Sequence, residues 1–123
     1  MRFRPRSRLT APSAARDSGG VSTEIVYDFE WDAAKALSNA AKHGVTFDRA
    51  ATVFRDALAL TVFDSAHSQS EERWFTLGVD AGGALLAVAH TYQATGPASA
   101  RARLISAREA TPRERRFYEE EPR

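Results

Sequence analysis

Four segments of β-strand character follow one another closely, and this succession constrains the fold more than any other feature of the sequence. They cover residues 58–64, 72–79, 84–92 and 101–106. The turn Asp80-Ala81-Gly82-Gly83, between the second and third segments, contains glycines that readily adopt the positive φ of a tight hairpin. Loop 93–98 contains a Gly-Pro pair and is expected to be mobile. The sequence therefore predicts an antiparallel meander whose third strand is buried.

Two helices are predicted in front of the meander. Residues 33–42 are rich in alanine, Asp32 is a suitable N-cap, and Gly44 can take the left-handed conformation that commonly ends a helix. Thr46 caps a second, shorter helix that extends to about Phe54. Because the connection between them is so short, the two helices are expected to form an αα-hairpin.

One strand and one helix complete the predicted domain. Aromatic residues alternate along 25–30, which indicates a strand before the hairpin. Thr111-Pro112-Arg113-Glu114 is a capping box with proline in the first helical position, so a last helix extends to about Glu120. The predicted fold is an α+β domain with the order β-α-α-β-β-β-β-α. The two faces of its antiparallel sheet are expected to receive Trp74, Phe75, Leu77, Leu86, Val88, Leu104 and Ile105.

Composition excludes several kinds of site. The 123 residues, enough for one domain, include no cysteine, so neither a disulfide nor a thiol nucleophile is possible. The histidines at positions 43, 67 and 90 are too dispersed to form a metal motif, and we expect no metal and no cofactor. No apolar run approaches the roughly 18 residues that cross a bilayer. We therefore expect a cytoplasmic protein with no membrane partner.

Positive charge is concentrated in two regions. Residues 1–22 contain five arginines and little that can be buried, so we expect a disordered basic tail followed by a folded domain over residues 23–123. A nucleic-acid-binding arm is the alternative for this tail. Six further arginines lie between positions 101 and 116. Because the formal net charge of the whole chain is only +1, any anion site has to be local.

Two clusters before the last strand carry side chains suited to phosphate chemistry. Lys42 and His43 could bind a phosphate and transfer a proton, or they could simply complement the dipole at the end of the first helix. Glu71 and Arg73 are two positions apart and project from the same face of a strand. They could serve as a base and a phosphate clamp, or form a surface ion pair.

A third cluster joins Arg103 and Arg108 of the last strand with the C-terminal helix. Glu114 and Tyr118 share a face of that helix. The hydroxyl of Tyr118 could contact RNA or donate a proton, or it could only anchor the helix to the sheet. Unpaired arginines are costly to bury. We therefore expect these two arginines and Arg73 to share one surface near His43, or to pair with Glu71, Glu109 or Glu114.

Taken in order, these clusters resemble the BrnT family of type II toxins. The opening of that family is matched by Phe29-Glu30-Trp31-Asp32, Lys35, Asn39, Lys42-His43-Gly44-Val45 and Phe47. The match continues through Val53-Phe54, Asp56, Asp64, His67-Ser68, Glu71, Arg73 and Gly78. It ends with Arg103-Leu104-Ile105-Ser106-Ala107-Arg108, Ala110-Thr111, Glu114 and Tyr118, so the resemblance covers about residues 26–120.

The resemblance implies a RelE-like ribonuclease that cleaves RNA without a metal and thereby inhibits translation and growth. It also implies a BrnA-like ribbon-helix-helix antitoxin, bound in a hetero-oligomer. Attack of the RNA 2′-hydroxyl on the neighbouring phosphodiester needs a base, cations and an acid. The implied candidates are Glu71 or His43 as base, Arg73, Arg103 and Arg108 as clamps, and Lys42, His43 or Tyr118 as acid. The alternative is a catalytically inactive module that only binds its antitoxin or nucleic acid.

Overall fold

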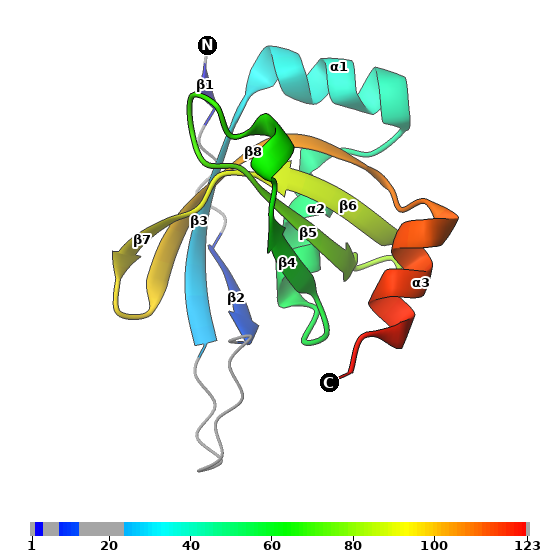
Figure 1. Ribbon diagram of the computed structural model, residues 1–123. Coiled ribbons are helices and arrows are strands. Elements are labelled where there is room, and N and C mark those ends of the chain that lie inside the picture. Colours follow the sequence, from blue (N-terminus) through cyan, green and yellow to red (C-terminus); the bar gives the residue numbers. More distant parts are fainter. Residues whose placement is uncertain (1, 4–7, 13–23, 123) are drawn as a thin grey trace.

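A computed structural model describes residues 2–3, 8–12 and 24–122, and these form a mixed sheet flanked by helices (Figure 1). The strands are β1 (Arg2–Phe3), β2 (Arg8–Pro12), β3 (Glu24–Asp32), β4 (Leu60–Phe63), β5 (Trp74–Val79), β6 (Leu85–His90), β7 (Gln93–Gly96) and β8 (Ser99–Glu109). The α-helices are α1 (Ala33–His43), α2 (Phe47–Ala51) and α3 (Pro112–Glu120), with 3-10 turns η1 (Thr52–Arg55) and η2 (Ser65–His67).

The helices begin and end where their capping residues predict. The Asp32 carboxylate accepts a hydrogen bond from Lys35 N at 3.0 Å, and Gly44 ends α1 with a φ of 71°. Thr46 caps α2, which continues as the 3-10 turn η1 rather than as one longer helix. At α3 the capping box is complete, since Thr111 and Glu114 each accept the other's backbone N–H through their side chains. These caps confirm the helical segments predicted from the sequence.

The sheet has the strand order β1-β3-β8-β6-β5-β4, with β2 also paired to β3 and β7 to β8. The meander β4, β5, β6 and β8 is antiparallel, as predicted. However, β3 and β8 are parallel, so the prediction of a purely antiparallel sheet is wrong at this pair. The reason is that both helices and the whole meander separate these strands in the sequence, and only such a long connection allows two strands to run in the same direction.

Three of the described strands are additional to the predicted order. β7 folds back on β8 where a mobile loop over 93–98 was expected. β1 and β2, which lie within the expected tail over 1–22, pair antiparallel with β3. Both additions have the same physical reason: they give backbone partners to strand edges that would otherwise be open. The remainder of the expected tail lies outside the described residues.

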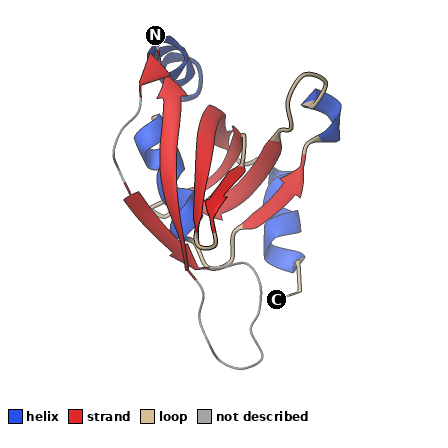
Figure 2. Cartoon of the chain, turned by 90° about the vertical axis from the view of Figure 1, so that its left-hand side faces the viewer, coloured by secondary structure: helices blue, strands red, loops and turns tan. Residues whose placement is uncertain are grey.

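The sheet separates two layers (Figure 2). On one side α1, α2 and η1 cover it, and the hydrophobic core lies between them and the sheet. On the other side α3 and η2 cover it only in part. The buried apolar side chains of the core are Phe29, Trp31, Val45, Phe47, Ala50, Ala51, Val53, Phe54, Leu86, Val88, Ala102, Leu104 and Ala107. We call the second, partly covered side the open face of the sheet.

Asn39 attaches α1 to the sheet within this core. Its amide nitrogen donates to Val45 O at 3.0 Å and to Ala107 O at 2.8 Å, and its amide oxygen accepts from Ala107 N at 3.0 Å. The amide therefore satisfies both backbone groups of a β8 residue from a helix. It fixes the end of α1, with Lys42 and His43, relative to the strand that carries the arginines.

Candidate functional site

β8 presents three arginines on the open face of the sheet. Ala102 and Leu104 are buried in the core, so their neighbours Arg101 and Arg103 project to the opposite side. Arg108 also lies on that side, because its guanidinium carbon is 5.5 Å from the centre of the Phe75 ring, which faces α3. The open face therefore carries a row of cations along one strand.

A β-bulge places Arg108 on this face. Five positions separate it from Arg103, and in a regular strand an odd spacing puts two side chains on opposite faces. The ladder with β6 skips Ile105: Leu104 and Ser106 face adjacent β6 residues. This extra residue restores the alternation, so that Ala107 is buried and Arg108 is not.

Arg103 is paired with Glu71, which is one of the pairings predicted from the sequence. Glu71 lies in the loop between η2 and β5, and its Oε1 accepts a hydrogen bond from Arg103 Nη2. That hydrogen bond is the largest cause that lowers the pKa of Glu71, with further contributions from the charges of Arg103 and Arg73. The carboxylate is therefore held in its ionised form.

A polar cavity of about 410 Å³ surrounds this pair. Its lining contains Glu30, Glu71, Glu72, Thr91, Tyr92, Gln93, Arg101 and Arg103. Glu30 is only 4% exposed, and Arg101 lies 3.8 Å from its carboxylate. Sequence reasoning missed Glu30 and Arg101 as parts of the site. The alternation along β3, where Tyr27 and Phe29 face the core, was the signal that places Glu30 on the open face.

Arg73 continues the row across the sheet. It precedes β5 and extends the alternation of Phe75 and Leu77, which point to the open face. Its backbone is fixed, since Ser68 Oγ accepts from its N–H at 3.0 Å and its carbonyl accepts from Asp64 N at 2.8 Å. Its Nε is buried and has no hydrogen-bond partner among the described residues. Arg73 forms no ion pair within the described part of the chain, so its charge is not neutralised by a carboxylate there.

Arg108 is bound to Glu114 in a two-pronged contact. Nη1 donates to Oε1 at 2.8 Å and Nη2 donates to Oε2 at 3.0 Å. The same Oε1 accepts from Thr111 N, so one carboxylate both caps α3 and holds the arginine. The pair lowers the pKa of Glu114 and raises that of Arg108. The predicted pairing of these two residues is thus present in the structure.

Tyr118 does not join the arginines but anchors α3. Its hydroxyl donates to Asp56 Oδ2 at 2.5 Å. The same carboxylate accepts from the backbone N–H groups of Leu58 and Val79, at 2.9 Å each. This arrangement favours the anchoring interpretation of Tyr118 over a role as proton donor.

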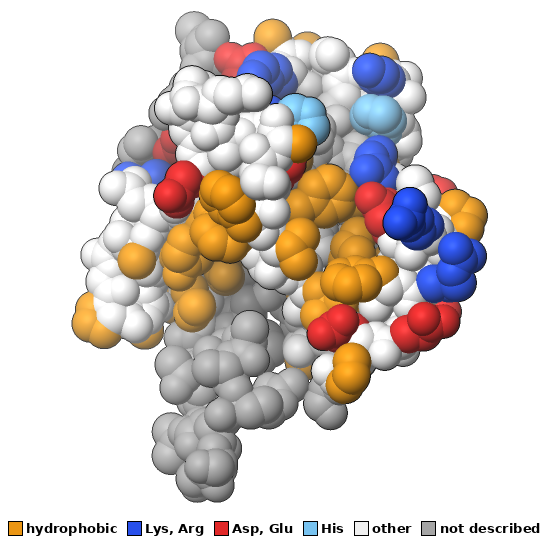
Figure 3. Space-filling view, viewed as in Figure 1, with side chains coloured by type: hydrophobic (Ala, Val, Ile, Leu, Met, Phe, Trp, Pro, Cys, Tyr) orange, Lys and Arg blue, Asp and Glu red, His pale blue; other side chains and the backbone are white. Residues whose placement is uncertain are grey.

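Lys42 and His43 are exposed at the C-terminal end of α1. Within the described part of the chain, no hydrogen bond or ion pair joins them to Arg73, Arg103 or Arg108. Lys, Arg and His side chains, with acidic side chains among them, follow the right-hand margin of this view from the C-terminal end of α1 to α3 (Figure 3). His67, which the resemblance also includes, is 3.0 Å from the carboxylate of Asp64.

The described residues therefore define an α+β domain whose open sheet face carries a row of arginines, three of them paired with carboxylates of the same chain. A family model described as "Ribonuclease toxin, BrnT, of type II toxin-antitoxin system" matches residues 31–114. The chain belongs to this family of ribonuclease toxins, which confirms the resemblance seen in the sequence. Membership implies an antitoxin partner and an RNA target. No curated protein matches the chain. No helix among the described residues is long and apolar enough to cross a membrane.

Proposed function

We propose that residues 23–123 form a metal-independent endoribonuclease that acts in the cytoplasm, with a RelE-like arrangement of sheet and helices. A BrnA-like ribbon-helix-helix antitoxin holds it inactive in a hetero-oligomer. Family membership supports the RNA target and the antitoxin. The observation that carries the proposal is Arg73, which follows Glu71 by two positions in the sequence. Its Nε has no hydrogen-bond partner among the described residues. An RNA phosphate would pair with the charge of this guanidinium.

Phosphate binding prepares Glu71 to act as the base. The scissile phosphate binds Arg73 and takes the guanidinium of Arg103 away from Glu71. Because the hydrogen bond from Arg103 is the main cause that lowers the pKa of Glu71, its loss raises that pKa and makes the carboxylate a stronger base. The substrate thus activates the group that deprotonates it.

The reaction then follows the chemistry of RNA itself. Glu71 removes the proton of the 2′-hydroxyl, the 2′-oxygen forms a bond to phosphorus, and the bond from phosphorus to the 5′-oxygen breaks. Arg73 and Arg103 stabilise the charge that develops on the phosphate oxygens. The products are a 2′,3′-cyclic phosphate and a 5′-hydroxyl end.

His43 is the acid that we assign to the leaving 5′-oxygen. It lies exposed beside Lys42 and makes no hydrogen bond among the described residues that would have to be broken. Tyr118 is the poorer candidate, because its hydroxyl already donates to Asp56. Arg108 contributes to binding once a phosphate displaces Glu114.

The test is cleavage of a labelled RNA by the purified chain in the presence of EDTA. We expect cleavage to persist and to leave 2′,3′-cyclic phosphate ends. Glu71→Gln should abolish it, whereas Glu120→Gln, on the exposed surface of α3, should not. Loss of cleavage in EDTA that Mg²⁺ restores, or 5′-phosphate ends, would show that the proposed mechanism is wrong.

One observation favours a second candidate function. Arg103 and Arg108 are both neutralised by carboxylates of this chain, Glu71 and Glu114. A protein in which these pairs never open would bind its antitoxin or nucleic acid without cleaving RNA. Expression of the chain alone discriminates the two candidates, because only the enzyme arrests growth and degrades cellular RNA.

A further inference from the structure

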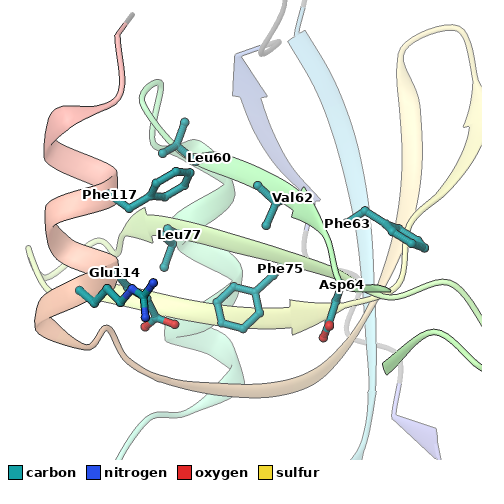
Figure 4. A pocket seen from close by; sticks show the side chains of 9 residues that line it. Leu60, Val62, Phe63, Asp64, Phe75, Leu77, Glu114 and Phe117 are labelled. Carbon is teal, nitrogen blue, oxygen red and sulfur yellow. The ribbon is translucent and has the colours of Figure 1, made fainter. Parts of the chain in front are cut away.

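A groove lined mainly by apolar side chains lies between α3 and the edge of the sheet, beside the arginine row. It has a volume of about 420 Å³. Phe117 of α3 points across it towards Leu60 of β4 (Figure 4). The other apolar side chains of its lining are Val62, Phe63, Phe75 and Leu77. Phe75 also carries the guanidinium of Arg108, so the groove is continuous with the candidate RNA site.

The groove opens at an exposed strand edge. β4 stands at the end of the strand order and pairs only with β5 among the described strands. Val62 and Phe63 of this strand are 45% and 46% exposed, and Phe117 across the groove is 47% exposed. Apolar side chains that remain exposed next to an open edge are typical of a binding surface for an extended segment.

The wall formed by α3 is attached mainly through polar contacts. No residue of this helix is buried. Its described side-chain contacts to the rest of the domain include the pair of Glu114 with Arg108 and the hydrogen bond from Tyr118 to Asp56. No described segment of the chain fills the groove that α3 borders, so the apolar side chains remain available to another molecule.

Charge indicates the chemistry of that molecule. Arg113 lines the groove and forms no ion pair in the described part of the chain. The two carboxylates that line the groove are already engaged, Glu114 by Arg108 and Asp64 by His67. An apolar segment that carries a carboxylate therefore complements both the wall and its one unpaired lining cation.

We propose that this groove is where the antitoxin docks, through an extended apolar segment that pairs with the edge of β4. An aliphatic or aromatic side chain of that segment fits between Phe75 and Phe117, and an acidic residue reaches Arg113. This inference rests on the proposed partnership with an antitoxin but not on the assigned catalytic residues. Because the groove adjoins Arg108, the docked segment also closes one end of the RNA site.

The test uses the full chain and the protein product of the gene adjacent to its own, with affinity measured by calorimetry. Val62→Asp and Phe117→Asp place a carboxylate on each side of the groove, and we expect each to weaken binding by about 30-fold or more. Leu37→Asp is the matched control: Leu37 is 75% exposed on α1, in the opposite layer, and its variant should bind as the original chain does. Melting temperatures and RNA cleavage check that all three variants fold.

The charged contact has its own test. Arg113→Glu should weaken antitoxin binding and reduce its salt dependence, whereas Arg115→Glu, outside the groove, should do neither. Unchanged binding of Val62→Asp and Phe117→Asp would overturn the docking site while leaving the partnership intact. No binding by the original chain would instead overturn the partnership. A dimer of the free chain that Val62→Asp converts to a monomer would assign the groove to a second copy and also overturn the proposal.

Discussion

Arg108 and Glu114 face each other across the junction of β8 and α3, joined by two hydrogen bonds of 2.8 and 3.0 Å. The carboxylate occupies the position that a phosphate would take on this guanidinium. The same carboxylate closes the capping box of α3. The pair therefore links the stability of the helix to the availability of the arginine.

Glu114→Gln should separate these two effects. Glutamine can still close the capping box, so α3 should remain folded, but the amide no longer neutralises Arg108. We expect binding of a non-cleavable RNA analogue to tighten by about fivefold, as for loss of a competing pair worth about 1 kcal/mol. Glu119→Gln, which alters a pair at 3.8 Å on the outer surface of α3, is the control. Equal affinities of all three proteins would mean that Arg108 does not contact RNA.

Arg73 should be required for activity in a way that lysine cannot replace. The buried Nε donor is absent from lysine, so both Arg73→Ala and Arg73→Lys should lower the cleavage rate by about 10²-fold or more. Arg115→Ala should keep the original rate. Circular dichroism should show the same fold for all three variants. A fully active Arg73→Lys variant would remove Arg73 from the site.

Asn39→Ala should destabilise the whole domain. Three hydrogen bonds are lost, and both backbone groups of Ala107 are left buried without a partner. The expected loss in free energy of unfolding is roughly 2–4 kcal/mol, measured by urea denaturation. Ser38→Ala, one position away on the exposed side of α1, should change it by less than about 0.5 kcal/mol.

Stability should fall as the pH drops below neutrality, because of His90. Burial lowers the pKa of this histidine from 6.5 to about 4. The unfolded chain therefore binds a proton between these values while the folded chain does not. The contribution of neutral His90 to the free energy of unfolding is fully present above about pH 6.5. It is lost between pH 6.5 and pH 4, which lowers the free energy of unfolding by roughly 3 kcal/mol.

The hydrogen bonds of His90 require its neutral form, the form that is lost when the histidine binds a proton. Nδ1 faces the carbonyl oxygen of Thr91 at 2.8 Å and must donate to it, so Nε2 accepts from the hydroxyl of Thr76 at 2.7 Å. His90→Gln should flatten the stability profile between pH 6.5 and 4. Gln69→Ala, at an exposed position without an ionisable side chain, is the control and should keep the original profile. A steep profile in His90→Gln would assign the effect to other groups.

Local signals predicted the helices and the meander well. Asp32, Thr46, Gly44 and Thr111 act on residues only a few positions away, and their capping roles follow from residue type alone. The same holds for the alternation that placed apolar side chains of β6 and β8 in the core. These features depend on neighbours in the sequence, which the sequence itself displays.

Long-range pairing could not be predicted in the same way. The parallel contact of β3 with β8 and the addition of β7 depend on which strand edges remain open after the meander has formed. Likewise, the sequence offered Glu71 as a possible partner of Arg73, Arg103 or Arg108, and only the structure selects Arg103, 32 positions away, among them. Asn39 entered only through the resemblance, because its buried amide shows no local pattern.

The extra residue in β8 also makes the length tolerance of this strand one-sided. Deleting Ile105 would leave four positions between Arg103 and Arg108, an even spacing that keeps both on the open face of a regular strand. Adding a residue there would move Ala107 to the surface and Arg108 into the core, unless the bulge took up a second extra residue. In chains of this family, spacings of four or five between the corresponding arginines are thus compatible with one shared RNA face. An even spacing of six would put both arginines on one face of a regular strand. With the single bulge seen here, it would instead put them on opposite faces.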